Sequence, residues 1–279
     1  MSLPVHWLNA EHGAGVQPTD RGLSYGDGVF ETFRCQSGLI HLWPLHRERL
    51  FRGLEVLGIP LAEARLEQQL ALACDYLQGH DIADAAGRVT ITRGPGDRGY
   101  RGATGEASIL CSLYPTSPWR ALPDPVELVI CNSTLSRQPR LAGIKHCNRL
   151  EQVLAARELE SRGAEDGVLL NDRGELTCAL AANIFVVRKG ELLTPPVNEC
   201  GIAGTVRRLV IETLAPEAGI DCRETVLMPS DLADAEEMFL TSSLSGLRQV
   251  SHCEGVFFTS SRWGDTLRDS FYRWSESTA

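Results

Sequence analysis

One lysine, Lys145, stands in the segment Leu141-Ala-Gly-Ile-Lys-His-Cys-Asn-Arg-Leu-Glu-Gln-Val-Leu154. Its neighbours are small or apolar, so its amine would be partly desolvated, which favours the neutral, nucleophilic form. Position alone favours instead a lysine at a helix entry that extends into solvent, but the near absence of other lysines shifts this balance. The chain has one other lysine, Lys189, and its remaining 25 basic residues are arginines. Lys189 lies in a predicted turn beside Gly190, so Lys145 is the stronger candidate for covalent chemistry.

Strands and helices alternate on both sides of this segment. Downstream, the pattern predicts a helix over 148–161, hairpins of 168–170 with 176–177 and of 184–187 with 191–194, a helix from Thr205 and a strand over 238–241. Upstream, it predicts strands over 29–35, 40–43, 88–92, 108–113 and 126–131, and helices over 44–57 and 64–77. Three prolines between Tyr114 and Pro123 favour a linker over 116–121. We therefore expect an α+β fold of two α/β domains, residues 1–115 and 122–279, with the lysine in the second.

Composition excludes several classes of protein. The 279 residues are 43% hydrophobic and 23% charged, with mean hydropathy -0.11, as in an ordinary globular protein. A net charge of -9 argues against a nucleic-acid partner. No apolar run reaches eighteen residues and the N-terminus lacks a basic region, so neither a membrane span nor a secretory signal is predicted. Nine cysteines without a C-x-x-C pair indicate free thiols in the cytoplasm and no metal site.

Two glycine-containing loops could bind anions. Gly201-Ile-Ala-Gly-Thr-Val-Arg207 leads into a helix, where free backbone N–H groups and the helix dipole favour a phosphate, although a plain helix start fits as well. Arg93-Gly-Pro-Gly-Asp-Arg-Gly-Tyr100 follows a strand and carries two arginines and a phenol that could bind a carboxylate, or it could be a solvated surface loop. Neither motif is specific by itself.

Two further motifs have ordinary structural explanations. The stretch Asp20-Arg-Gly-Leu-Ser-Tyr-Gly-Asp-Gly-Val-Phe-Glu-Thr-Phe-Arg34 combines a glycine-rich turn with the start of a strand, and its polar residues suit turns. His46 and Arg49 lie three residues apart on one side of a predicted helix, where a solvated face is the default interpretation.

Together, however, these motifs resemble a known family. The order D-R-G-L-x-Y-G-D-G-V-F-E-T-x-R, H-x-x-R-L, T-R-G-x-x-x-R-G-Y, G-I-K-H-x-N-R-L-E-Q-V, A-N-I-F and G-I-x-G-x-x-R is similar to the fold-type IV pyridoxal-phosphate enzymes over residues 20–250. That family includes branched-chain aminotransferases, D-amino acid transaminases and aminodeoxychorismate lyases. The lysine segment and Arg98-Gly-Tyr100 look most like the lyase branch.

The resemblance implies a role for individual residues. Lys145 matches the Schiff-base lysine that holds pyridoxal 5'-phosphate, and Arg49 matches a phosphate-binding arginine. Gly204, Thr205 and Val206 match the phosphate cup, and Ser243 matches a further phosphate-binding hydroxyl. Arg98 and Tyr100 are our candidates for a substrate carboxylate. The resemblance also implies two α/β domains with the cofactor between them, usually as a homodimer.

One position departs from the family pattern. Relatives place a glutamate five residues before the asparagine of A-N-x-F, where it contacts the pyridine nitrogen, and here that position is Cys178. Glu175 is three residues away and would reach the same face only across a bulge. A thiol cannot hold a pyridinium as a carboxylate does. We expect this exchange to disfavour transamination more than a lyase reaction driven by formation of an aromatic product.

The resemblance therefore implies a lyase that converts 4-amino-4-deoxychorismate to 4-aminobenzoate and pyruvate, a step toward folate. A D-amino acid or branched-chain aminotransferase is the alternative within the fold. A binding protein that has lost the cofactor is the alternative outside catalysis.

Overall fold

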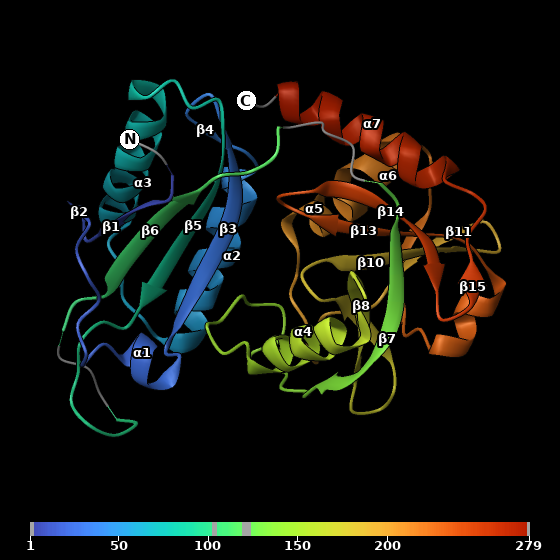
Figure 1. The fold of residues 1–279 in the computed structure, drawn as a ribbon, viewed down its shortest axis with the longest axis horizontal. Helices are drawn as coiled ribbons and strands as arrows, with labels where there is room; N and C mark the ends of the chain where they lie inside the picture. Colours follow the sequence, from blue (N-terminus) through green and yellow to red (C-terminus); the bar gives the residue numbers. More distant parts are fainter. Residues whose placement is uncertain (1–2, 102–104, 119–123, 278–279) are drawn as a thin grey trace. The chain divides into compact units, whose positions relative to one another are not determined.

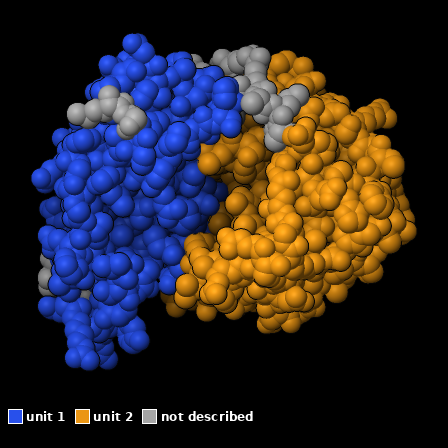
Figure 2. Space-filling model, viewed as in Figure 1, with its two compact units in different colours: residues 1–121, 144–148, 279 blue, residues 122–143, 149–278 orange. Residues whose placement is uncertain are grey.

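The computed structural model describes residues 3–101, 105–118 and 124–277, and the chain divides into two compact units, coloured separately in Figure 2. The first unit comprises residues 1–121 with 144–148, and the second comprises 122–143 with 149–278. The sequence placed Lys145 in the C-terminal domain, but the contacts of residues 144–148 group this segment with the first unit. Residues 119–121 of the predicted linker lie outside the described residues. The domain limits of 115 and 122 stay a prediction.

The first unit is built on a six-stranded antiparallel sheet with the order β2-β1-β6-β5-β3-β4 (Figure 1). Its strands are β1 (Val5–Leu8), β2 (Glu11–His12), β3 (Gly28–Gln36), β4 (Leu39–Ile40), β5 (Asp84–Thr92) and β6 (Ser108–Tyr114). The long β3–β5 pair runs from Gly28 opposite Thr92 to Gln36 opposite Asp84. This pairing fixes the β3 backbone at Phe30 and Glu31, whose side chains belong to the candidate site.

Three helices belong to the first unit: α1 (Arg21–Tyr25), α2 (Trp43–Leu57) and α3 (Glu63–Gly79). Leucines of α2 and α3 pack with Phe33 in the core, and each fully buried leucine contributes about 2 kcal/mol of hydrophobic stabilisation. The predicted strand over 40–43 was wrong beyond Ile40. Leu42 takes a left-handed conformation (φ 57°) and α2 starts at Trp43 with a proline in its first turn, which suits a helix start.

The second unit is a mixed sheet with the order β12-β11-β10-β13-β14-β7-β8-β9, to which β15 adds on β14. Its strands are β7 (Val126–Leu135), β8 (Asp166–Asn171), β9 (Leu176–Ala179), β10 (Asn183–Arg188), β11 (Glu191–Thr194), β12 (Cys222–Glu224), β13 (Ala235–Ser242), β14 (Gly246–Cys253) and β15 (Val256–Phe257). Both predicted hairpins are present, as β8–β9 and β10–β11. Lys189 is exposed in the second turn, at φ 52°.

Helices cover this sheet as well. They are α4 (Leu150–Arg162), α5 (Thr205–Leu209) continuing through a π-helical turn (Val210–Leu214) into α6 (Ala215–Glu217), a 3-10 turn (Pro229–Asp234) and α7 (Arg262–Ser277). α4 packs on β7 and β8, and α7 on β13 and β14 (Figure 1). The buried carboxylate of Glu237 accepts hydrogen bonds from the amides of Trp263 and Gly264 and so caps α7. The predicted α+β fold is confirmed.

Three properties of the described residues bear on function. No helix among them is long and apolar enough to cross a bilayer. They contain no cluster of three or more His, Cys, Asp or Glu side chains that could hold a metal ion. All nine cysteines are free thiols.

Candidate active site

The lysine segment is bound to one edge of β3. The amide of Phe30 donates to the carbonyl of Lys145 (2.9 Å), and the amide of Cys147 donates to the carbonyl of Gly28 (2.9 Å). His146 faces Val29 in the same antiparallel bridge. These bonds fix the backbone from Lys145 to Cys147, directly after the Lys145 side chain.

The Phe30 ring contacts two basic side chains, which come from different segments of the chain. The Nζ of Lys145 lies 4.6 Å from the ring centroid, and the guanidinium carbon of Arg88 on β5 lies 3.8 Å from it. Both distances fall within the range of cation–π attraction. Burial lowers the pKa of Arg88. The Phe30 ring therefore contacts both the Lys145 amine and the Arg88 guanidinium.

Glu31, His46 and Arg49 form a buried network on β3 and α2. Nε of Arg49 donates to Oε1 of Glu31 (2.8 Å), an Nη of the same arginine bonds to Oε2, and Nδ1 of His46 lies 2.7 Å from Oε2. Glu31 and His46 are fully buried. The solvated helix face expected for His46 and Arg49 was therefore wrong, because a strand carboxylate lies under both.

The charges in this network are set by its burial and its partners. Desolvation opposes ionisation of Glu31, but the charge and hydrogen bonds of Arg49 and the hydrogen bond of His46 lower its pKa to about 2. Desolvation lowers the pKa of His46, against the pull of Glu31, so the ring is neutral. Nδ1 then carries the proton that Glu31 accepts. One carboxylate thus orients the guanidinium of Arg49.

A loop and a helix start in the second unit present backbone amides that could bind an anion. Gly204 is the N-cap of α5, and Thr205 and Val206 are its first residues, whose amides have no acceptor within the helix. A Cβ on Gly204 would come within 2.0 Å of the side-chain oxygen of Asn183, so any other residue there would have to displace the Asn183 side chain. The side-chain Nδ2 of Asn183 in turn donates to the carbonyl of Ile202 (2.9 Å). The loop is therefore held rigidly.

Hydroxyl groups lie beside this loop. Thr241 stands opposite Asn183 in the β10–β13 register. Its hydroxyl is buried and has no hydrogen-bond partner among the described residues. Ser243 follows just after β13 and is half-buried. An unpaired buried hydroxyl is costly, which indicates a place where a polar ligand would bind.

Cys178 lies on β9 opposite Leu169, and the register shifts by one residue next to this pair. Across the shift, Leu176 packs in the main core of the unit, whereas Cys178 packs with Leu169, Cys131 and other residues under α4. Glu175 precedes the strand, and its carboxylate accepts a hydrogen bond from the side chain of Asn171 (2.6 Å). A bulge is thus present, but Glu175 is engaged in the hairpin turn.

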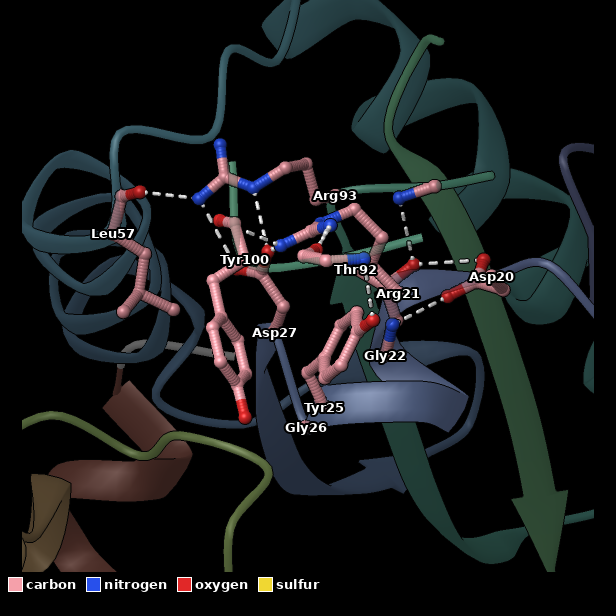
Figure 3. A network of polar contacts seen from close by, with 12 residues as sticks. Asp20, Arg21, Gly22, Tyr25, Gly26, Asp27, Leu57, Thr92, Arg93 and Tyr100 are labelled. Carbon is pink, nitrogen blue, oxygen red and sulfur yellow. Dashed lines mark hydrogen bonds and ion pairs between the residues drawn. The ribbon is translucent and has the colours of Figure 1, made fainter. Parts of the chain in front are cut away.

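The loop with Arg98 and Tyr100 follows β5 and is exposed, Tyr100 to 88%. Its backbone is held from below by residues of α1 (Figure 3). The glycine-rich stretch from Asp20 therefore contains a short helix, capped by the Asp20 carboxylate on the amide of Gly22 (2.8 Å).

The structure thus places the predicted site residues in two groups. Lys145 and Arg49 belong to the first unit, as do Arg98 and Tyr100; Cys178, Gly204, Thr205, Val206 and Ser243 belong to the second. Sequence reasoning did not single out Phe30, Glu31 or Arg88. The sequence Phe30-Glu31 in β3 could have pointed to Glu31 as a site residue. A histidine and an arginine three residues apart on a buried helix face need a carboxylate as partner, and Glu31 supplies it.

Comparison with known proteins gives consistent results. Residues 28–253 match the family model "Amino-transferase class IV". An aminodeoxychorismate lyase of Vibrio harveyi is 33% identical over 88% of this chain and 90% of its own. A putative branched-chain-amino-acid aminotransferase of Methanocaldococcus jannaschii is 30% identical over 92% and 89%. The crystal structure of a 4-amino-4-deoxychorismate lyase from Pseudomonas aeruginosa superposes with a TM-score of 0.86 at 34% identity, covering 96% of this chain and 98% of the other.

The two sheets and the lysine segment define the class of the protein as a fold-type IV pyridoxal-phosphate enzyme. Within that class, the chain belongs to the amino-transferase class IV family. In the second unit, the residues present fit the phosphate end of the cofactor: the amides of Thr205 and Val206 have no acceptor within the helix, and the buried Thr241 hydroxyl has no hydrogen-bond partner among the described residues. Arg49 belongs to the first unit, where Glu31 holds it. At the pyridine position, Cys178 offers a thiol where a carboxylate would fit better.

Proposed function

We propose that this chain is a pyridoxal-phosphate-dependent lyase that converts 4-amino-4-deoxychorismate to 4-aminobenzoate and pyruvate. The observation that carries the proposal is Lys145, whose carbonyl is hydrogen-bonded to β3 and whose Nζ lies 4.6 Å from the Phe30 ring centroid. Similarity to aminodeoxychorismate lyases over nearly the whole chain supports the choice of reaction.

Each residue would have a defined task. Lys145 would hold the cofactor through its amine, and Arg49, the amides of Thr205 and Val206, and Ser243 would bind the phosphate. The bound cofactor supplies the electron withdrawal that acidifies C4 of the substrate. With the cofactor bound, the amine of Lys145 would be placed to take the proton from C4 and to give a proton to the methylene carbon of the enolpyruvyl group as that group leaves as pyruvate. The ring becomes aromatic and pyruvate leaves.

The substrate is a dianion entering a protein of net charge -9, so local cations must offset its charge. Arg98 and Tyr100 lie on an exposed loop that can reach a carboxylate of an incoming molecule. We propose them as the substrate-binding pair.

The experiment supplies 4-amino-4-deoxychorismate to purified protein and follows 4-aminobenzoate fluorescence and pyruvate. We expect both products in equal amounts without an amino acceptor. Activity that requires 2-oxoglutarate would instead establish an aminotransferase, the candidate favoured by the Methanocaldococcus relative. A colourless protein that borohydride does not modify would establish a binding protein.

We also propose a homodimer in the cytoplasm. One side of α4 exposes three apolar side chains, namely Leu150 (76% exposed), Val153 (50%) and Leu154 (57%). An exposed apolar patch of this kind suits a surface that a second copy of the chain covers. Nine free cysteines suit a reducing compartment. Light scattering on the eluting protein should give twice the 30.6 kDa chain mass.

A further inference from the structure

The loop that carries Arg98 and Tyr100 is exposed, yet its backbone is bound by side chains. Nη1 of Arg21 donates to the carbonyl of Gly99 (2.7 Å), and Nη2 donates to the carbonyl of Tyr100 (3.2 Å). The hydroxyl of Tyr25 accepts from the amide of Gly99 (2.9 Å). Figure 3 shows both residues reaching the loop from α1. Three backbone groups of Gly99 and Tyr100 thus have side-chain partners.

Arg21 is itself fixed in the body of the unit. It is 4% exposed, its Nε donates to Asp27 (3.0 Å), and its guanidinium lies 4.8 Å from the Tyr25 ring centroid. Asp27 is shared with Arg93, which also donates to the carbonyls of Leu57 and Gly58 at the end of α2. Burial alone would raise the pKa of Asp27. The hydrogen bonds from Arg93 and Arg21 outweigh burial and lower this pKa, so the carboxylate keeps its charge. The loop is therefore tied to α2 through charged groups.

The turn at Gly99 depends on glycine. Its φ is 106°, a conformation that other residues rarely adopt, and a Cβ there would meet no atom within 4 Å. The backbone conformation, not lack of space, requires the glycine. The rings of Tyr25 and Tyr100 lie 5.4 Å apart, so the phenol of Tyr100 also rests on α1.

We propose that Arg21 and Tyr25 are positioning residues that fix the backbone of residues 98–100 and thereby aim the Arg98 guanidinium and the Tyr100 phenol at a carboxylate of the substrate. Their own polar groups are occupied by the loop and by Asp27, so they act through Arg98 and Tyr100. A loop ordered before binding loses less entropy when a substrate arrives. The inference rests on the proposed function, since it assigns Arg98 and Tyr100 to substrate binding.

The test removes single atoms from this support. Tyr25→Phe deletes the hydroxyl that accepts from Gly99 and keeps the ring, and Arg21→Lys keeps the charge but loses the paired donors. We expect KM for 4-amino-4-deoxychorismate to rise about 3- to 10-fold with Tyr25→Phe and more with Arg21→Lys, with kcat within twofold. Tyr76→Phe is the matched control, because the Tyr76 hydroxyl is buried and has no hydrogen-bond partner among the described residues.

A second readout needs no activity. Trypsin cleaves after arginine, and we expect Tyr25→Phe to speed cleavage after Arg98 several-fold while the thermal midpoint stays within 2 °C of the wild type, about the shift a small ΔΔG gives. A double-mutant cycle joins the readouts: once Arg98→Ala is present, Tyr25→Phe should change KM no further.

Two outcomes would overturn the inference. One is an unchanged KM together with unchanged cleavage in both variants. The other is a double variant in which the separate increases in KM caused by Tyr25→Phe and Arg98→Ala multiply, as for independent sites. If the wild type forms no 4-aminobenzoate, the proposed function fails, whereas the cleavage comparison still decides whether Arg21 and Tyr25 fix the loop.

Discussion

Arg49 donates from Nε and from an Nη to both carboxylate oxygens of Glu31, a side chain with no exposed surface. A paired fork of this kind fixes the plane of the guanidinium. The arginine expected to bind the cofactor phosphate is therefore oriented before any ligand arrives. The residue that orients it directly follows Phe30, whose amide donates to the carbonyl of Lys145.

Glu31→Gln should destabilise the protein by about 3 kcal/mol, because it removes the buried carboxylate that pairs with the mostly buried charge of Arg49. Urea unfolding of the cofactor-free protein at pH 7 measures this. Glu63→Gln is the control, since its ion pair with Arg47 is exposed and should be worth less than 1 kcal/mol. Equal losses in the two variants would contradict the assignment.

The same pair predicts a dependence on pH. The folded-state pKa of Glu31, about 2, is below its ordinary value of 4.5, so the unfolded chain binds more protons between these values. The stabilisation by Glu31 is present above pH 4.5 and is lost as the pH falls toward 2. The difference in unfolding free energy between wild type and Glu31→Gln should stay level from pH 7 to 5 and shrink below 4.5. A difference that grows on acidification would be inconsistent with an ionised Glu31.

Lys145→Ala should abolish covalent retention of the cofactor and lower turnover at least a thousandfold, because the variant lacks both the anchor and the base. Mass spectrometry after borohydride reduction locates the adduct. Lys189→Asn is the control, since Lys189 lies exposed in a turn at φ 52°, a conformation that asparagine tolerates. An adduct on Lys189, or none in the wild type, would refute the role of Lys145.

The sequence predicted most elements of the fold because their patterns are local. The hairpin around Asp172-Arg-Gly174, the strand over 29–35 and the helix after Lys145 all follow from turn residues and periodicity. α1 and β4 were missed or misjudged because a capped five-residue helix and a left-handed Leu42 leave little periodic signal.

The site was harder to predict because its partners are distant in the chain. The buried contact of Arg49 with Glu31 spans a strand and a helix, and the Lys145 segment joins β3 across more than a hundred residues. No local pattern encodes such pairing. The motifs at 20–34, 46–50 and 143–153 could be connected through family resemblance, but Arg88 and Tyr25 stood out only when the distances were known.

Arg98→Ala should raise KM for the substrate about tenfold and leave kcat within threefold, because it removes a charge-assisted contact to a carboxylate remote from the reacting atoms. Steady-state kinetics with 4-aminobenzoate detection measures both constants. Arg65→Ala offers a comparison, as Arg65 is a half-buried arginine on α3 that contacts Ala107 and Glu106. A wild-type KM in Arg98→Ala would show that another cation binds the carboxylate.

Cys178→Glu tests the departure from the family pattern. A carboxylate at this position would hold a protonated pyridine nitrogen, which a thiol cannot do, and would strengthen the electron withdrawal on which transamination depends. We expect the rate of amino transfer from D-alanine or a branched-chain amino acid to 2-oxoglutarate to rise about tenfold, with the lyase rate changing less, because aromatisation already drives that reaction. Absorbance-coupled assays of both reactions, run at saturating cofactor, give the two rates.

Two features of the structure shape this last comparison. Cys178 is half-buried against Leu169 and Cys131, so a glutamate there must leave that packing, and some loss of stability accompanies the change. Cys178→Ala separates the effects, because it removes the thiol and the packing without supplying a carboxylate. Amino transfer that rises in Cys178→Glu and stays low in Cys178→Ala would assign the effect to the carboxylate. Equal rates in all three proteins would mean that position 178 does not control the pyridine nitrogen, and Glu175, now bonded to Asn171, would have to be tested in its place.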